Sequence, residues 1–580
     1  MSTQQYQGRL ELTWTNKDLC LLAHEDGTYQ WTPKADYRVA EVRLLHDAGT
    51  MGQVEPERMR ARDNLLICGD ALNALRSLTS LPEFAREHVG KVKLAYLDPP
   101  FNTKQSFLHY DDALEHSVWL TMMRDRLRQV EQLLSEDGSV WVHCDDSEQA
   151  YLKAMMDEVF GRPNFVTAFI WQKVDSPNDN KVAITPDHDY ILCYSKNPGA
   201  PKFRKMPDPS ILAAYGGVAD DGRHYRDRLL KKNGRNSLRR DRPSMFFPIP
   251  GPDGVDVYPI HDDGREACWA AGEVSVRAWL TAGKIVWKRR DAGDGAQKWV
   301  PYTREWAPSL PTRPWPTIWT DVKTTRQAKA HLSALFPGVT PFDTPKPEQL
   351  IARIIEIATN VGDIVLDCFL GSGTTAAVSH KMDRRWVGVE RSTKTLQAFI
   401  LPRLIAVVAG DDPGGITEDI GWAGGGSFRI LDVAPSMFED DKDTLFLADW
   451  AVNNKLSEAT AAQLCYAYDL DPPFCGRKGR SRLAVVDGLV NEGVVHLLAS
   501  VLPEGERLAV YGTAVDDGAR EAIRHLKPGS CVRKIPSALL AAYREERRWL
   551  VSDKTAERST DVMLAESTPE EAEAMEVVTA

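Results

Sequence analysis

The sequence predicts an α/β protein built on a doubly wound sheet, in which parallel strands alternate with covering helices. Two blocks, residues 61–200 and 321–410, repeat a pattern of short apolar runs followed by residues with helical spacing. Several of the apolar runs end in Asp, Glu or Gly, as strands do where they lead into functional turns. A segment rich in Pro, Gly, Arg and Trp separates the two blocks.

The first block contains three apolar runs of strand length, each followed by a helical pattern. We expect strands at 64–70, 91–97 and 137–146, and helices at 71–78, 119–134 and 148–160. In the second block we expect helices at 346–360, 371–382 and 393–408, and strands at 363–369 and 384–390. Because helices separate consecutive strands, these strands are expected to run parallel.

The chain divides into six segments on this pattern. They are a β-rich N-terminal segment (1–60), a first α/β half (61–200), an insertion (201–320), a second α/β half (321–410), a mixed C-terminal α/β domain (411–553) and an acidic tail (554–580). The tail is expected to be disordered, because its composition offers little apolar surface to bury.

The composition is that of a globular protein without a membrane span. Hydrophobic residues make up 43% and charged residues 26% of the chain, and no run of about eighteen apolar residues appears. The N-terminus lacks a basic-then-apolar leader, and the nine cysteines never form a C-x-x-C pair. We therefore expect a cytoplasmic protein with no membrane association, no disulfide framework and no metal site.

A glycine turn follows the expected strand 363–369, in the sequence Asp367-Cys-Phe-Leu-Gly371-Ser-Gly373-Thr-Thr. Glycines let a ligand approach the backbone, and the helix that follows offers free N–H groups. Glu390 ends the next strand, where a carboxylate can accept hydrogen bonds from ribose hydroxyls. A phosphate loop is excluded, because no G-K-[ST] follows. The alternative is a tight strand-to-helix turn that binds nothing.

The tetrapeptide Asp98-Pro99-Pro100-Phe101 follows the expected strand 91–97. Asp98 supplies an acceptor carboxylate, and Pro99 keeps its carbonyl, whose direction the next proline restricts. Two acceptors can grip both hydrogens of one amino group, and Phe101 offers a face on which a base could stack. The alternative is a proline-rich turn.

The same tetrapeptide recurs at 471–474. It follows residues 461–470, whose spacing indicates a helix and not a buried strand. Because short motifs recur by chance, we interpret this second copy as a turn that terminates a helix.

Three motifs in chain order carry a resemblance to a known family: LDPPFNT (97–103), DTPKP (343–347) and DCFLGSGTT (367–375). The chain resembles the permuted β-class of DNA amino-methyltransferases, and more closely the modification (Mod) subunits of type III restriction–modification systems. The resemblance covers most of residues 10–430. It implies a class I, Rossmann-like S-adenosylmethionine-dependent methyltransferase fold, a mixed sheet with permuted motif order and an inserted target-recognition domain. Lys104 and Cys368 depart from the residues that are frequent in the family.

The resemblance also assigns roles by motif. It implies that Asp98, Pro99, Pro100 and Phe101 form the catalytic loop. The residues implied to hold S-adenosylmethionine are Asp70, Lys346, Asp367, Phe369, Gly371, Gly373 and Glu390. Among them, Asp70 would meet the adenine of the cofactor, Glu390 its ribose and Lys346 its carboxylate. For Lys346 a solvent-facing lysine at a helix start is the alternative.

A basic run lies in the insertion, although the whole chain has a formal net charge of −11. Residues 222–243 carry nine Lys and Arg against two Asp. Such a run is by itself most often a solvated face, but the family places its target-recognition domain here. The candidates for DNA contacts are Arg223, Arg226, Arg228, Lys231, Lys232, Arg235, Arg239, Arg240 and Arg242.

The function that the resemblance implies is methyl transfer to adenine N6 in double-stranded DNA after base flipping. Cytosine-N4 methylation remains an alternative, since it uses the same grip on an amino group. A catalytically silent DNA-binding specificity subunit is an alternative of another class. We expect a homodimer, and a separate restriction subunit would have to supply helicase and nuclease activity, because the chain has no phosphate loop.

Overall fold

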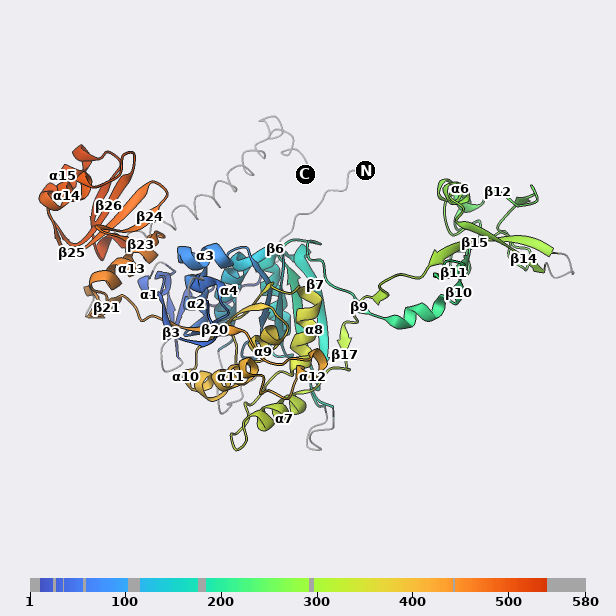
Figure 1. Cartoon of the computed structure of the whole chain (residues 1–580), viewed down its shortest axis with the longest axis horizontal. Coiled ribbons are helices and arrows are strands. Elements are labelled where there is room, and N and C mark those ends of the chain that lie inside the picture. The colour runs from blue at the N-terminus through green and yellow to red at the C-terminus, as the bar shows by residue number, and fades with distance from the viewer. Residues whose placement is uncertain are drawn as a thin grey trace, which may run out of the picture. The chain divides into compact units, whose positions relative to one another are not determined.

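The computed structural model describes residues 11–23, 28–34, 36–55, 59–102, 115–175, 184–291, 297–441 and 444–539 (Figure 1). The expected disordered tail, 554–580, therefore lies outside the described residues. The chain forms two compact units, which we describe separately: residues 1–204 together with 317–580, and residues 205–316. None of the helices in the described ranges is long and apolar enough to cross a membrane.

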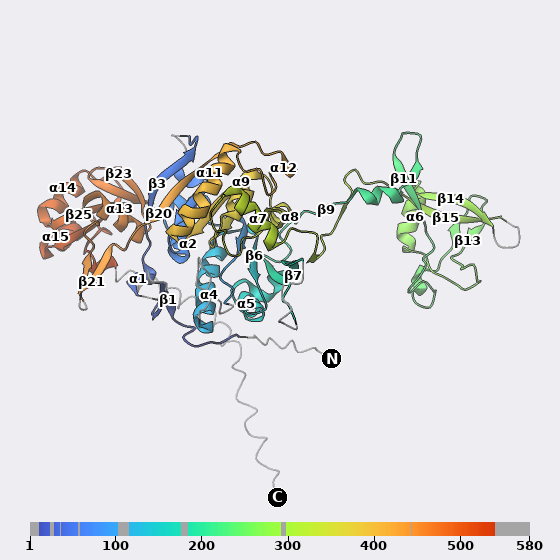
Figure 2. The same ribbon diagram turned by 90° about the horizontal axis from the view of Figure 1, so that it is seen from below.

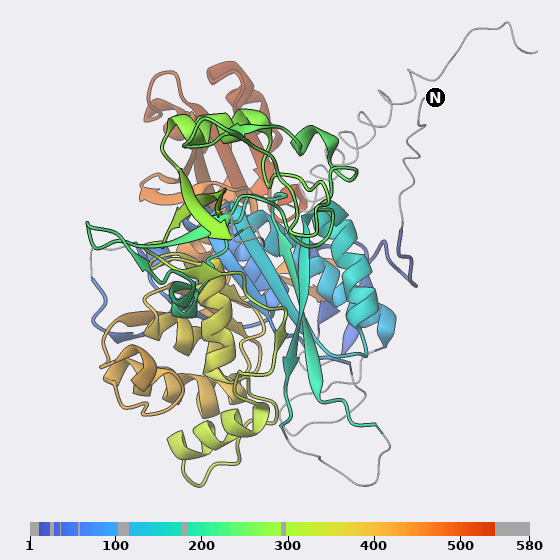
Figure 3. The same ribbon diagram turned by 90° about the vertical axis from the view of Figure 1, so that its right-hand side faces the viewer.

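A ten-stranded mixed sheet organises the larger unit. Its strands in spatial order are β17 (Ile318–Trp319), β7 (Phe165–Gln172), β8 (His188–Ser195), β6 (Leu134–Cys144), β5 (Val92–Leu97), β18 (Ile364–Asp367), β19 (Arg385–Glu390), β4 (Leu65–Cys68), β20 (Ser427–Val433) and β3 (Leu45–Gly52). Only β8 and β3 run antiparallel to their neighbours. Figure 3 shows β7 and β8 side by side. The expected strands of both blocks are thus confirmed.

The two expected halves meet in the middle of this sheet. Strand β5 of the first half pairs in parallel with β18 of the second, with Leu366 opposite Ala95. Because neighbouring parallel strands end at the same edge, the residues that follow β5, β18, β19 and β4 come together there. Residues separated by more than 250 positions in the chain therefore share one site.

Helices cover the sheet on both faces (Figure 2). One layer contains α2 (Ala71–Ser80), α3 (Pro82–His88), α4 (His116–Leu133) and α5 (Gln149–Met156), and the other contains α9 (Thr374–Lys381), α10 (Thr393–Thr395) and α11 (Leu401–Ala409). Alternate residues of one strand enter the two cores: Leu65 and Ile67 face the first layer, and Leu66 faces the second. The helix α8 (Glu348–Ala358) carries an apolar stripe that includes Leu350 and Ile354, both fully buried. The remaining helices of this unit are α1 (Tyr37–Ala40), α7 (Thr325–Leu335) and α12 (Thr417–Ile420).

The sheet extends beyond the boundaries that the sequence suggested. Strand β3 comes from the N-terminal segment, whose other strands, β1 (Cys20–Ala23) and β2 (Tyr29–Thr32), form a separate pair. Strand β20 comes from the segment that we assigned to the C-terminal domain, and it pairs with both β4 and β3. Neither strand is followed by a helix that returns to the sheet, so the alternating pattern could not include them.

A second sheet forms the C-terminal part of the same unit. Its order is β23 (Ala467–Asp471), β24 (Phe474–Lys478), β25 (Ser481–Val490), β26 (Arg507–Val515) and β27 (Cys531–Lys534). The helices are α13 (Asn453–Gln463), α14 (Glu492–Ser500) and α15 (Asp517–Leu526), of which α14 and α15 pack on one face. A short antiparallel pair, β21 (Phe438–Asp441) and β22 (Thr444–Leu447), precedes this sheet.

The second copy of the tetrapeptide lies in this C-terminal sheet. Asp471 pairs with Phe474 across the turn between β23 and β24, so that the copy joins two strands and does not terminate a helix as we predicted. The helix α13 already ends at Gln463, and residues 467–471 are extended. They are half-buried or exposed, so they lack the apolar run that marks a buried strand.

The insertion, residues 205–316, has its own small core. The antiparallel strands β10 (Gly217–Val218), β11 (His224–Leu229), β15 (Gln297–Trp306) and β14 (Ile285–Asp291) form a sheet in that order. Short pairs join β12 (Ile249–Pro250) to β13 (Asp256–Val257) and β9 (Met206–Pro207) to β16 (Thr312–Arg313). The helix α6 (Glu273–Thr281) contributes Val276 to a core with Leu230 and Trp269.

Candidate active site

Four carboxylates lie at or just beyond the carboxyl ends of neighbouring central strands. Asp98 follows β5, Asp367 ends β18, Glu390 ends β19, and Asp70 lies two residues beyond β4. They lie along the carboxyl-terminal edge of the sheet, where open α/β folds bind ligands. Asp367 is fully buried, and burial together with the charges of Asp98 and Glu390 raises its pKa to about 7.

The glycine turn is shaped by these carboxylates. Gly371 and Gly373 have φ angles of 53° and 80°, in the left-handed region that favours glycine. Glu390 accepts a hydrogen bond from the Gly371 N–H at 2.9 Å and another from the Ser392 N–H at 2.8 Å. The Phe369 N–H donates to Asp367 at 2.9 Å. The turn is therefore held open, with no side chain on either glycine.

The Asp98–Phe101 loop is anchored at its second proline and just beyond its end. The indole N–H of Trp119 donates to the Pro100 carbonyl at 2.6 Å. Asn102 has a left-handed φ of 61°, and its amide donates to the buried Glu148 at 2.7 Å. Within the described residues, the Pro99 carbonyl accepts no hydrogen bond. The loop is thus fixed while one of its two expected acceptors stays available. Thr103 and Lys104 lie outside the described residues.

Lys346 brings the two halves into direct contact. Its ammonium group lies 2.8 and 2.7 Å from the two carboxylate oxygens of Asp98 and 4.9 Å from the centre of the Phe101 ring. The Lys346 side chain is only 8% exposed. Because it is buried, the structure contradicts the alternative of a solvent-facing lysine.

A buried polar network of His143, Tyr96 and Asp189, which we did not predict, packs against Phe101. The His143 ring stacks on Phe101 with ring centres 5.6 Å apart, and His143 contacts the Tyr96 hydroxyl at 2.9 Å and Asp189 at 3.1 Å. Burial acts to raise the pKa of Asp189, but the hydrogen bond from His143 and the charge of Lys173 outweigh it and hold the pKa at about 2. Burial lowers the pKa of His143. In its neutral form His143 can donate its Nε2–H to Asp189 and accept from Tyr96 at Nδ1.

One sequence feature could have revealed this network. His143 is a polar residue within the otherwise apolar strand expected at 137–146, and a buried polar side chain needs polar partners.

Asp70 already has hydrogen-bond and ion-pair partners within the protein. Its carboxylate caps α2 by accepting from the Leu72 and Asn73 N–H groups, and it pairs with the buried Arg126 at 2.7 Å. The guanidinium of Arg126 also lies over the Phe369 ring, 6.0 Å from its centre. Asp70 thus lies at the expected edge of the sheet. To contact the adenine of the cofactor, its carboxylate would have to accept a further hydrogen bond beside those that cap α2.

A cluster of buried charges lies beneath the glycine turn. It consists of Glu348, Lys381, Arg403, Asp412 and His331. Glu348, Asp412 and His331 are metal-ligand types whose ligand atoms lie within 4.8 Å of one another. The ammonium of Lys381 is bonded to both carboxylates at 2.8 Å, so a protein cation already fills that position. Burial acts to raise the pKa of Glu348, but Arg403 and Lys381 outweigh it and lower the pKa.

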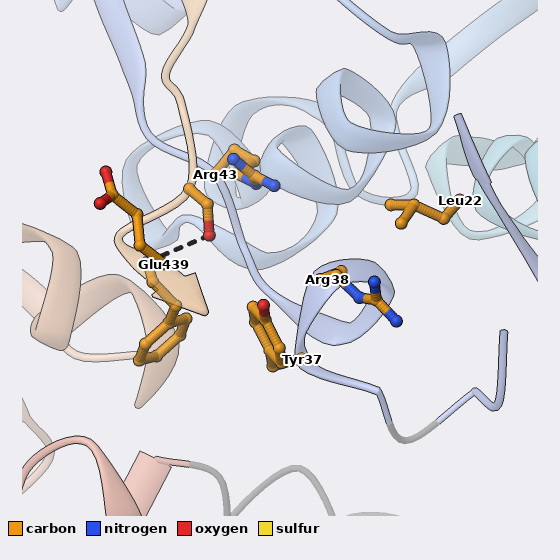
Figure 4. Close-up of a pocket in the computed structure, with 7 residues that line it drawn as sticks. Leu22, Tyr37, Arg38, Arg43 and Glu439 are labelled. Carbon is orange, nitrogen blue, oxygen red and sulfur yellow. Dashed lines mark hydrogen bonds between the residues drawn. The ribbon is translucent and has the colours of Figure 1, made fainter. Parts of the chain in front are cut away.

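A pocket of about 390 Å³ lies elsewhere in the larger unit (Figure 4). Its lining residues are Leu22, Tyr37, Arg38, Arg43, Ser436, Phe438 and Glu439. None of them belongs to the site that the sequence predicted. The pocket therefore does not mark the site described above.

Most of the nine predicted DNA contacts are ion-paired within the insertion. Arg226 and Arg228 share Glu305, and Arg239 pairs with Glu266 at 2.9 Å. Longer or exposed pairs join Arg223 to Asp221, Lys231 to Asp262 and Arg240 to Asp241. Lys232, Arg235 and Arg242 have no ion pair among the described residues. Exposed pairs are weak, so they do not prevent a contact with phosphate.

The comparison with protein families agrees with this geometry. The family model described as DNA methylase, for N6 and N4 methyltransferases, matches residues 92–400, which is more than half of the chain. The chain therefore belongs to the N6/N4 DNA methylase family.

Among its relatives are type III modification subunits. The "Probable type III restriction-modification enzyme HindVI Mod subunit" of Haemophilus influenzae is 30% identical over 64% of this chain and 54% of that protein. The EcoPI Mod subunit of Escherichia phage P1 is 28% identical over 61% of each chain. The type II methyltransferase M1.MboII of Moraxella bovis is 46% identical over 54% of this chain and 90% of that protein. The chain thus spans little more than half the length of the type III relatives.

Solved structures give a weaker likeness. The cytosine-N4-specific PvuII DNA methyltransferase has a TM-score of 0.32 and 16% identity, over 63% of this chain and 93% of that chain. The complex of M1.HpyAVI with S-adenosylmethionine has a TM-score of 0.27 and 16% identity, over 57% of this chain and 96% of that chain.

Proposed function

We propose that this protein transfers a methyl group from S-adenosylmethionine to adenine N6 in double-stranded DNA, as the modification subunit of a type III restriction–modification system. The observation that carries the proposal is the meeting of the Asp98–Phe101 loop and the Gly371–Gly373 turn at one edge of the sheet. The type III relatives support the assignment to that system, in which a second copy of the chain and a separate restriction subunit would be partners.

The residues at this edge fit the proposed cofactor. Gly371 and Gly373 adopt left-handed φ angles that let the backbone turn sharply here, and Asp367 and Glu390 accept from the Phe369 and Gly371 N–H groups at this turn. Glu390 keeps lone pairs beyond its two backbone hydrogen bonds and can accept from ribose hydroxyls. Lys346 is the cation available for the carboxylate of the amino acid part. S-adenosylmethionine supplies an electrophilic methyl group when it is bound.

Asp98 and Pro99 supply the two acceptors that the reaction needs. The N6 lone pair of adenine is delocalised into the ring, so the amino group is a poor nucleophile. Hydrogen bonds to the Asp98 carboxylate and the Pro99 carbonyl would favour a pyramidal nitrogen with a localised lone pair. As the N–C bond forms and the S–C bond breaks, the lost proton passes to Asp98 or to water. Phe101, supported by His143, would stack on the flipped base.

The experiment that tests this function is sequencing of DNA from cells that express the chain, read for modified bases. We expect N6-methyladenine at one recurring sequence. N4-methylcytosine would instead establish the cytosine alternative, and unmodified DNA from cells that contain folded protein would favour a silent specificity subunit.

We further propose that the insertion recognises the DNA target, through one face of its sheet. Residues 205–316 carry 19 Lys and Arg against 14 Asp and Glu, a formal charge of +5 in a chain of net charge −11. Ile285 and Trp287 of β14 pack on the core of the insertion. Side chains alternate along strands, so Lys288 and Arg290 lie on the opposite face.

This opposite face combines cations with aromatic rings. The register of β11, β14 and β15 places Lys288, Arg290, Lys298 and Arg304 on it, together with Tyr225, Tyr302 and Trp306. The guanidinium of Arg304 lies 3.6 Å from the centre of the Tyr225 ring, and Trp306 is 41% exposed. The sequence pattern does not reveal these four cations, because they are spread over two strands and form no long run.

Replacing Lys288, Arg290 and Lys298 together by glutamine should weaken DNA binding and reduce the salt slope by about one unit per lost phosphate contact. Arg289→Gln is the matched control, since Arg289 lies on the other face, over Trp299. Fluorescence anisotropy with a duplex, at several salt concentrations, measures both quantities. Equal losses in the triple variant and in the control would show that this face is not the contact surface.

A further inference from the structure

Lys346 holds the position that the amino group of a target base would need. Its ammonium donates to both oxygens of Asp98, at 2.8 and 2.7 Å, and lies over the Phe101 ring. These are the two side chains proposed to grip and stack the base. The ammonium occupies one acceptor site on each Asp98 oxygen and lies over the ring on which the base would stack, so a target amino group must share this position with Lys346 or displace it.

The side chain of Lys346 can move away from Asp98, whereas hydrogen bonds hold its backbone in place. The Thr374 hydroxyl donates to the Lys346 carbonyl at 3.2 Å, and Arg403 donates to the same hydroxyl at 2.9 Å. Arg403 is itself bound to the buried Glu348 at 2.8 Å. Hydrogen bonds thus hold the backbone of Lys346 to the glycine turn and to the buried charge cluster. The ammonium can therefore change partner by rotation of the side chain alone.

A buried ammonium cannot leave one carboxylate without reaching another. Asp367 is a poor substitute, because burial raises its pKa to about 7 and it is partly protonated at neutral pH. Glu390 holds the turn through Gly371 and Ser392, and its remaining lone pairs are the acceptors proposed for the ribose hydroxyls. Among the described residues, neither of the two is bonded to Lys346. Asp189, whose pKa is also lowered by the charge of Lys346, is already bonded to His143 and Lys173. The partner open to Lys346 is therefore a carboxylate that arrives with a ligand.

We propose that Lys346 exchanges partners, pairing with Asp98 in the free protein and with the carboxylate of the cofactor once the cofactor is bound. This inference rests on the proposed function. The exchange empties the amino-group position only when the methyl donor is present, so that cofactor binding precedes capture of the base. Lys346 acts through Asp98 and is a positioning residue.

Calorimetry with two nucleosides tests the exchange without DNA. S-adenosylhomocysteine carries the amino acid carboxylate, whereas 5′-methylthioadenosine lacks the amino acid part. We expect Asp98→Asn to free Lys346 and to tighten S-adenosylhomocysteine binding about tenfold, while 5′-methylthioadenosine binding stays the same. Lys346→Met should weaken S-adenosylhomocysteine binding by a similar factor, again without affecting 5′-methylthioadenosine.

The double variant separates exchange from general electrostatics. If Lys346 mediates the effect, Asp98→Asn no longer tightens S-adenosylhomocysteine binding in the Lys346→Met background. The same tightening in both backgrounds, or none in the wild-type background, overturns the exchange. Lys346→Gln, which keeps a donor for Asp98, serves if the methionine variant does not fold. If the wild-type protein binds neither nucleoside, the proposed function itself fails.

Discussion

Asp98→Ala should reduce methyl transfer to DNA by about a hundred- to a thousandfold or more. The change removes an acceptor that acts on the reacting amino group, and losing one such preorganised contact costs about this much in enzymes. S-adenosylhomocysteine binding should persist or become tighter, because the Gly371–Gly373 turn makes no hydrogen bond to Asp98 and the change also frees Lys346. Transfer of labelled methyl groups to DNA by the folded variant measures the effect.

Asp471→Ala is the matched control, since it alters the second copy of the same tetrapeptide. Asp471 lies in a hairpin turn and pairs with Arg482 at 3.3 Å while 65% of its side chain is exposed. Removing it should leave turnover near the wild-type value and alter stability by at most about 1 kcal/mol. An inactive Asp471 variant beside an active Asp98 variant would place the catalytic loop in the C-terminal sheet and refute our assignment.

Lys381→Met should lower the free energy of unfolding by about 3–5 kcal/mol. Lys381 is fully buried and bonded to both Glu348 and Asp412, so its loss leaves two buried carboxylates with too little positive charge. Adding Glu348→Gln should cost much less than the sum of the two single changes, because it removes one of those carboxylates. Chemical unfolding of the three variants measures these differences.

Arg520→Met provides the comparison for an exposed pair. Arg520 pairs with Asp517 at 3.1 Å, and its side chain is 45% exposed, so we expect a change below about 1 kcal/mol. A cost for Lys381→Met as small as that for Arg520→Met would mean that Lys381 is not needed to balance the buried carboxylates of Glu348 and Asp412.

The alternating pattern of the sequence predicts the central strands because they are buried on both faces, and it predicts helices such as α2 and α8 because each carries an apolar stripe. The pattern does not predict that β3 and β20 belong to this sheet, because they join its edge by antiparallel or long-range pairing. Short motifs at strand ends locate Asp98, Asp367 and Glu390, since position at a strand's carboxyl end fixes the edge of the sheet.

Partners that are distant in the chain could not be predicted from spacing. Lys346 and Asp98 are 248 residues apart, and only the pairing of β5 with β18 brings them together. Likewise, the cations on β14 and β15 gather on one face only after the strands pair. Local sequence reveals which chemistry each residue can do, whereas tertiary pairing decides which residues act together.

Methylation of adenine at N6 through Asp98 is what we propose for this chain. Nucleoside analysis tests it most directly, on DNA incubated with purified protein and S-adenosylmethionine that carries a labelled methyl group. We expect label in N6-methyladenine with the wild-type protein, and its loss with Asp98→Ala. Label in N4-methylcytosine would contradict the assigned base, and undiminished label with Asp98→Ala would contradict the assigned active site.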